Sequence, residues 1–180
     1  MGSTGWPEAA TRAMLILSWN FQGMERPLTV QILKGLISTH CPTVVFLMET
    51  KNKAARGVVS PPDRVCSWAV ALVYAPPQRG NHRGIWGQFK RMVSGIKYPL
   101  LCIGDFNEIR ASGEKQGGVE CCMSQLQFFV ELLSDYALMD LEFNGALYTW
   151  SNNQLGEDNI RERLDRAVAT VDWRALYSCA

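Results

Sequence analysis

The 180-residue sequence lacks an excess of charge of either sign. Its 18 Lys and Arg face 17 Asp and Glu, which leaves a formal net charge of +1. A protein that coats nucleic acid over its whole surface needs a basic excess, so the balance excludes that class and confines any polyanion site to a local patch. The sequence also lacks a long apolar run, because Thr43 to Met48 falls far short of the roughly 18 residues of a membrane span. We therefore expect no membrane partner.

Histidine and paired cysteine are scarce as well. The only histidines are His40 and His82, and none of the six cysteines forms a CxxC pair, so a zinc cluster is not expected. The apolar stretch from Met14 to Leu17 is too short for a secretory signal. We therefore expect reduced thiols in an intracellular protein of the nucleus or cytoplasm.

What is present is the composition of one globular domain, with 47% apolar and 19% charged residues. Residues 1–12 show no period and are expected to form a disordered leader, with a single domain over residues 13–180. Short apolar runs alternate with segments in which apolar residues recur every three or four positions, and this pattern predicts an α/β architecture. The expected strands are Met14–Asn20, Thr43–Glu49, Ala69–Tyr74, Leu100–Ile103, Leu147–Trp150 and Arg163–Val168; the expected helices are Pro27–His40, Arg83–Lys97 and Met123–Leu133; Lys51–Arg64 is expected to be a loop.

Carboxylates and carboxamides follow three of the expected strands. These are Asn20, Glu49, and Asp105 with Asn107. If the strands lie side by side, their oxygen atoms gather at one edge, where they suit a hard cation such as Mg²⁺. Asp105 and Asn107 share a face as long as the chain stays extended. Any one of these residues could instead be an ordinary turn residue.

Asp165 lies in an apolar frame between Arg163 and Arg166. A carboxylate in such a strand needs a partner. The sequence leaves two alternatives open, a catalytic role and an internal ion pair with an arginine of the same motif.

Two segments could contact a phosphate backbone. No acidic residue occurs between Asp63 and Asp105, whereas Arg79, Arg83 and four other basic residues do. This segment could equally be the solvated face of a helix. Further along, Thr149, Trp150 and Asn152 combine a hydroxyl, an aromatic ring and an amide, groups that suit contacts to a nucleic-acid backbone or groove.

Six short strings occur in the order that is typical of the endonuclease/exonuclease/phosphatase superfamily, which the sequence resembles from Met14 to Trp173. Two further strings, Glu114–Gly118 and Leu138–Leu141, resemble the endonuclease domain of plant LINE-type retrotransposons. The six strings are Leu17–Asn20, Phe46–Lys51, Val73–Pro77, Gly104–Glu108, Tyr148–Trp150 and Glu162–Arg166.

The resemblance implies a DNase-I-like α/β sandwich, in which two mixed β-sheets pack together with helices outside. It also implies attack of water on a phosphodiester bond of DNA with Mg²⁺ or Mn²⁺ as cofactor. By the same resemblance, Glu49 is the principal metal carboxylate and Asn20 its amide neighbour.

The remaining roles come from the same resemblance. Tyr74 matches a tyrosine that contacts the phosphate, and Asp105 matches the residue that orients or deprotonates the water. Asn107 matches a supporting phosphate ligand. Asp165 matches the aspartate of a late Arg-Leu-Asp motif.

Two departures lower the expected activity. The family ends in a Ser-Asp-His motif, whereas no histidine follows His82 here, and only Asn52 to Val73 fill an interval in which the family has several strands. We expect part of the first sheet to be missing and the C-terminal strand to be truncated, which would leave an exposed sheet edge or an uncovered apolar patch near Cys66 and Trp68. Loss of an electrostatic stabiliser costs about 100-fold to 1,000-fold in rate.

The leading prediction is therefore a retrotransposon-derived endonuclease domain that is weak or inactive. One alternative is a phosphatase or phosphodiesterase of the same superfamily that acts on a small substrate. The other alternative is a non-catalytic remnant that still binds DNA. No oligomer is predicted.

Overall fold

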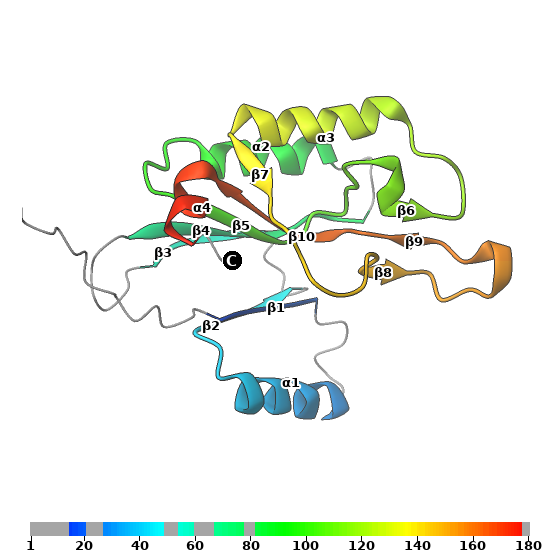
Figure 1. Cartoon of the computed structure of the whole chain (residues 1–180), viewed down its shortest axis with the longest axis horizontal. Helices are drawn as coiled ribbons and strands as arrows, with labels where there is room; N and C mark the ends of the chain where they lie inside the picture. The colour runs from blue at the N-terminus through cyan, green and yellow to red at the C-terminus, as the bar shows by residue number, and fades with distance from the viewer. Residues whose placement is uncertain (1–14, 21–26, 49–53, 60–66, 78–81, 178–180) are drawn as a thin grey trace, which may run out of the picture. The chain divides into compact units, whose positions relative to one another are not determined.

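The computed structural model describes residues 15–20, 27–48, 54–59, 67–77 and 82–177 (Figure 1). The chain divides into two compact units, residues 1–47 and 48–180, which are described here one at a time. The expected leader, residues 1–12, lies outside the described residues. The single domain over residues 13–180, the missing part of the first sheet and the truncated C-terminal strand stay predictions.

The first unit contains the elements expected from its periodicity. Strand β1 (Ile16–Asn20), helix α1 (Pro27–His40) and strand β2 (Val44–Met48) follow one another, and the two strands pair in a small sheet. Pro27 opens the helix, a position where its missing N–H costs no hydrogen bond. The residue after β2, Glu49, lies outside the described residues.

The second unit is built on a mixed sheet of five strands in the order β3-β4-β5-β10-β7, which we call the main sheet. Strands β4 and β5 are parallel, and the other neighbours are antiparallel. The strands are β3 (Ala54–Val59), β4 (Trp68–Tyr74), β5 (Leu100–Asp105), β7 (Leu138–Asp140) and β10 (Asp165–Thr170).

The expectation of a loop over Lys51–Arg64 is wrong for its central part, because β3 lies there. All six residues of β3 pair with β4, from Ala54 opposite Val73 to Val59 opposite Trp68. Arg56 and Gly57 interrupt any apolar alternation, so the strand depends on pairing with a buried neighbour rather than on its own propensity.

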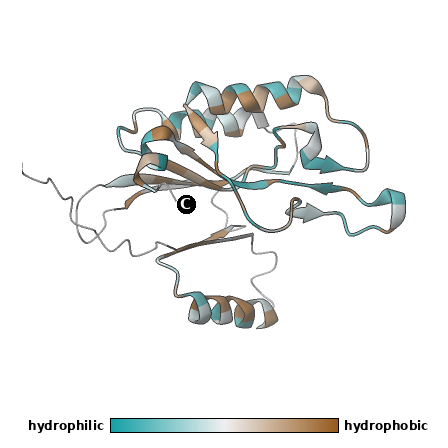
Figure 2. Cartoon of the chain, in the orientation of Figure 1, coloured by the Kyte–Doolittle hydropathy of each residue, from teal (hydrophilic) through white to brown (hydrophobic). Residues whose placement is uncertain are grey.

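Two helices, α2 (His82–Val93) and α3 (Met123–Asp135), cover one face of the main sheet (Figure 1). Their apolar stripes meet in an aromatic cluster, where Trp86 stacks on Phe106 with ring centroids 6.1 Å apart and contacts Phe129 at 5.7 Å. Hydrophobic and hydrophilic residues alternate along α3 in the way that an amphipathic helix requires (Figure 2). This cluster is the centre of the core.

A short helix, α4 (Val171–Leu176), follows β10 and brings Trp173 against Trp68 at a centroid distance of 5.8 Å. Trp68 is 0% exposed, so it is not part of the uncovered apolar patch that was one of the two alternatives. Cys66 lies outside the described residues.

A second, three-stranded sheet extends from one end of the main sheet (Figure 1). It consists of β6 (Lys115–Gln116), β9 (Arg161–Glu162) and β8 (Trp150–Ser151), with short 3-10 turns η2 (Ser112–Glu114) and η3 (Gly156–Asp158) beside them. Of the strand expected over Leu147–Trp150, only Trp150 is in β8. Gly117 has φ +77°, and a Cβ there would overlap the backbone of Asn159.

Within the described parts of the chain, no helix is long and apolar enough to cross a membrane. The four cysteines found there, Cys41, Cys102, Cys121 and Cys122, are free.

Gly104 makes the close approach of β5 to β4 possible just before Asp105. Its φ is +141°, and a Cβ would overlap the carbonyl oxygen of Val73. We expect Gly104→Ala to lower the free energy of unfolding by about 3 kcal/mol, measured by urea denaturation. The matched control Gly84→Ala lies in α2 with open space around it and is expected to stabilise by about 0.5 to 1 kcal/mol. Equal effects at both positions would contradict the close approach.

Candidate active site

Three predicted site residues lie side by side across the main sheet. Tyr74 pairs with Asp105, and Asp105 pairs with Asp165, on three neighbouring strands. Residues directly opposite one another point to the same face, so the three side chains form one row. We call Tyr74, Asp105 and Asp165 the carboxylate row.

The carboxylate row lies on the face opposite to α2 and α3. Ala71, Cys102 and Val168 are paired across the same strands and belong to the core beneath the helices. Each member of the row is three residues away from one of them along its strand. Because side chains alternate with a period of two, an odd spacing places the row on the other face.

Asp105 and Asp165 form a close cross-strand pair. The N–H of Phe106 donates to the carbonyl of Leu164 at 3.0 Å, so Phe106 and Leu164 are the hydrogen-bonded pair of the antiparallel ladder. The preceding pair, Asp105 and Asp165, is then the non-hydrogen-bonded kind, in which Cα atoms are only about 4.5 Å apart. Two carboxylates in this position repel each other unless a proton or a cation lies between them.

Asn107 fixes the end of β5. Its φ is +49°, its backbone N–H donates to Asp105 Oδ1 at 2.9 Å, and its side-chain amide donates to the carbonyl of Ala75 at 2.6 Å. The turn therefore holds the Asp105 carboxylate and ties the ends of β4 and β5 together.

Burial raises the pKa of Asp165, although hydrogen bonds, the largest of them from the Thr149 side chain, and the charge of Arg166 act in the opposite direction. A raised pKa means that the ionised form is less favoured here than in water. The group is therefore suited to hold a proton or to bind a cation.

The arginines on either side of Asp165 form their ion pairs with other carboxylates, while the charge of Arg166 still lowers the pKa of Asp165. Asp165 and Arg166 are adjacent in a strand and so point to opposite faces. Arg166 donates to Glu114 Oε2 at 2.8 Å and to Asp140 Oδ2 at 2.9 Å. Arg163 donates to the same two carboxylates, at 2.9 Å to Glu114 Oε1 and 3.0 Å to Asp140 Oδ1. We call these four residues the buried ion-pair network.

Sequence reasoning missed this network as a structural unit. Arg166 also donates to the backbone carbonyls of Glu108 and Arg163, both at 3.0 Å. The only hint was that Glu114 and Asp140 fall in the two strings that resemble LINE-type endonucleases.

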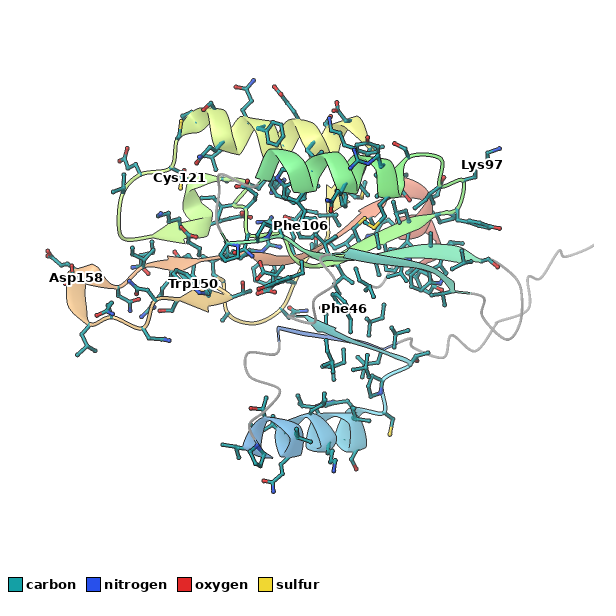
Figure 3. All side chains as sticks on the ribbon, turned by 180° about the vertical axis from the view of Figure 1, so that it is seen from behind. Phe46, Lys97, Phe106, Cys121, Trp150 and Asp158 are labelled. Atoms are coloured by element: carbon teal, nitrogen blue, oxygen red, sulfur yellow. The ribbon has the colours of Figure 1, made fainter. Side chains whose placement is uncertain are left out.

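The residues predicted to contact substrate differ in the contacts that they make in the structure. Thr149 Oγ1 accepts the backbone N–H groups of Leu164 and Asp165, each at 3.0 Å, so its hydroxyl holds the start of β10. Trp150 is 41% exposed and lies in the three-stranded sheet (Figure 3). The Asn152 side-chain amide donates to the backbone carbonyl of Asp158, and its Oδ1 accepts the backbone N–H groups of Gln154 and Ile160, so its hydrogen bonds are made within its own loop.

Arg79 lies outside the described residues, as does the side chain of Arg83. The side chains of the two predicted metal ligands are also outside the described part. Glu49 is outside altogether, and of Asn20, at the end of β1, only the backbone is described.

The described donors fit a hard cation in type but not yet in number. The carboxylates of Asp105 and Asp165 are oxygen ligands of the kind that Mg²⁺ prefers. Within the described residues, no group of three or more His, Cys, Asp or Glu side chains could hold a metal ion. A complete Mg²⁺ site would therefore also need the predicted Glu49.

The chain has a DNase-I-like α/β fold, the fold of a class of endonucleases, as the sequence predicted. It is similar to the solved endonuclease domain of TRAS1, described as a telomere-specific non-LTR retrotransposon. The TM-score is 0.64 at 15% sequence identity, and the match covers 89% of this chain and 86% of that one. No protein-family model and no curated protein matches the sequence.

The two hydrogen bonds accepted by Thr149 give a direct test of how β10 is held. We expect Thr149→Val to lower the free energy of unfolding by about 2 kcal/mol, because it leaves one part-buried and one exposed N–H group without their acceptor. Thr149→Ser keeps the oxygen and should cost less than about 1 kcal/mol. Equal losses in both variants, measured by urea denaturation, would show that the hydroxyl has no such role.

The buried ion-pair network should make the free energy of unfolding depend on pH in the acidic range. Burial acts to raise the pKa of Glu114, but hydrogen bonds from Arg166 and Arg110 and the charges of Arg166 and Arg163 together hold it below its ordinary value of 4.5. A lowered pKa contributes stability that is complete above pH 4.5 and is lost as the pH falls through the folded-state pKa.

We expect Glu114→Gln to cost about 3 kcal/mol at pH 7, and to flatten the decline of stability below pH 4.5. The control Glu157→Gln, in the exposed turn η3, should change stability by less than about 0.5 kcal/mol and keep the decline. Thermal unfolding followed from pH 7 to pH 3 measures both. A Glu114→Gln curve parallel to the wild type would contradict the assignment.

Proposed function

We propose that this chain is a metal-dependent phosphodiester hydrolase that acts on DNA, of the retrotransposon-endonuclease type. The observation that carries the proposal is the carboxylate row, in which Asp105 and Asp165 are a close pair with Tyr74 beside them. Asp105 lies at the end of β5 and Asp165 at the start of β10, on the sheet face opposite to Arg166. A close pair of acids in this position suits proton transfer and cation binding, whereas it does not favour stability.

In this proposal Asp105 orients and deprotonates the attacking water. Its carboxylate is held through Oδ1 by the backbone N–H of Asn107, which fixes its direction. Asp165, whose pKa is raised by burial, is placed to exchange a proton with the reacting groups. Tyr74 contacts a phosphate oxygen.

Glu49, Asn20 and Asp105 are the proposed ligands of Mg²⁺ or Mn²⁺, and Asp165 keeps its separate role in proton transfer. The bound ion would polarise a phosphoryl oxygen and offset the charge that develops on it. Support for the retrotransposon type comes from the strings Glu114–Gly118 and Leu138–Leu141, which resemble plant LINE-type endonucleases, and from the structural likeness to the TRAS1 domain.

The proposed activity of the 180-residue chain is slow. The family places a histidine of a Ser-Asp-His motif at the phosphate, and no histidine follows His82 here. Without such a donor the rate is expected to fall by about 100-fold to 1,000-fold.

We expect slow, Mg²⁺-dependent nicking of supercoiled plasmid by the purified chain, which EDTA abolishes. Asp105→Asn should lower the rate by about 100-fold or more, because the amide cannot take a proton but still accepts the Asn107 N–H. The control Asp135→Asn changes an exposed carboxylate that pairs with Lys90 at the end of α3 and should leave the rate unchanged. Agarose-gel assays measure all three proteins.

Two outcomes would contradict this function. Nicking that persists in Asp105→Asn would place the chemistry elsewhere. A salt-dependent gel shift without cleavage, even at high protein concentration, would favour the non-catalytic DNA-binding remnant instead.

A further inference from the structure

The outermost strand of the main sheet, β7, has one edge whose backbone groups face away from the sheet. The N–H of Leu141 donates to the carbonyl of Ala167 at 2.9 Å, which continues the antiparallel ladder between β7 and β10. Hydrogen-bonded and non-hydrogen-bonded pairs alternate along such a ladder. Met139 is therefore bonded to β10, whereas the N–H and C=O groups of Leu138 and Asp140 point outward. In the described parts of the chain no strand pairs with that side.

A cavity of about 590 Å³ runs along this edge. All three residues of β7 line it, although their side chains alternate between the two faces of the sheet. A cavity on one face would meet only alternate residues, so this one follows the strand edge itself. Its other walls are mainly apolar and include Val130 and Leu133 of α3 and Val171 at the start of α4.

The cavity also has a positive charge. Arg110 lines it, with its Nε 3.6 Å from Asp140 Oδ2 and its side chain 48% exposed. That carboxylate is already bonded by Arg163 and Arg166. Arg110 is therefore the third guanidinium group on Asp140, at the longest distance of the three and half exposed, so an acidic ligand could compete for it.

We propose that the β7 edge binds an extended peptide segment of a partner protein as an added strand. Strands that expose backbone N–H and C=O groups are templates for pairing with another chain. The peptide would pair with Leu138 and Asp140, place an apolar side chain in the cavity, and direct an acidic side chain to Arg110. A nucleic acid does not fit, because the walls are apolar and only one cation lines the cavity.

The test uses a capped peptide of sequence TEVLVET and backbone amide hydrogen exchange measured by NMR on the full chain. At peptide concentrations up to about 1 mM, the exchange of the Leu138 and Asp140 amides should slow by about tenfold or more, whereas Met139 is already bonded and should change little. A peptide with proline in place of both valines cannot pair and should have no effect. Lysine in place of both glutamates should weaken binding.

Variants separate the two contacts. Arg110→Gln should weaken binding by about threefold, since an exposed ion pair is worth less than about 1 kcal/mol. Val171→Glu puts a charge in the apolar wall and should abolish binding without unfolding, because Val171 is 58% exposed in the first turn of α4. The matched control Val119→Glu is 85% exposed and does not line the cavity, so binding should be unchanged.

Three results would overturn the proposal. The first is unchanged exchange of both amides at the highest peptide concentration. The second is equal protection by the proline peptide, which would mean that no strand forms. The third is protection that rises with protein concentration in the absence of peptide, which would assign the edge to a second copy of this chain.

Discussion

The buried ion-pair network is the constraint on which the second unit depends. Its two guanidinium groups and two carboxylates come from η2, β7, the residues before β10 and β10 itself, and the Arg166 side chain is completely buried. Taking four charges out of water is costly, so their attraction must be supplemented by further hydrogen bonds. Arg166 supplies them at the carbonyls of Glu108 and Arg163, and thereby joins the chain after β5 to the chain before β10. Removing any one partner would leave a charge buried without its counter-charge.

This network also determines where Asp165 points. A strand has a period of two, so fixing Arg166 on the helix side of the main sheet fixes Asp165 on the opposite side. A slip of β10 by one residue would exchange the two, and it would break every bond of Arg166 at once. The position of Asp165 opposite Asp105 is therefore held by contacts on the far face of the sheet.

Periodic local patterns predicted most of the long elements, whereas features set by pairing between distant segments could not be predicted. α1 and α3 have clear apolar stripes, and β4 and β5 are continuous apolar runs, so their existence follows from sequence. β3 contains Arg56 and Gly57 and shows no such pattern, and β6, β8 and β9 are two residues long, too short for any period. Asp105, Asp165 and Tyr74 were identified as candidates one by one, but their alignment depends on strand register. Thr149 was expected to touch substrate, yet its hydroxyl serves two N–H groups that only the fold brings to it.

The separation of charges across the main sheet argues for a functional role of the carboxylate row. On the helix side, Glu114 faces two guanidinium groups and Asp140 faces three, and the pKa of Glu114 is lowered, as in a structural ion pair. On the other side, burial raises the pKa of Asp165, and the nearest acid along the ladder is another aspartate. A sequence under pressure for stability alone would not keep two acids as a close cross-strand pair, because apolar residues of similar size would remove both the repulsion and the desolvation cost. Carboxylates whose burial and mutual repulsion cost free energy are the kind of group that binds a cation or transfers a proton.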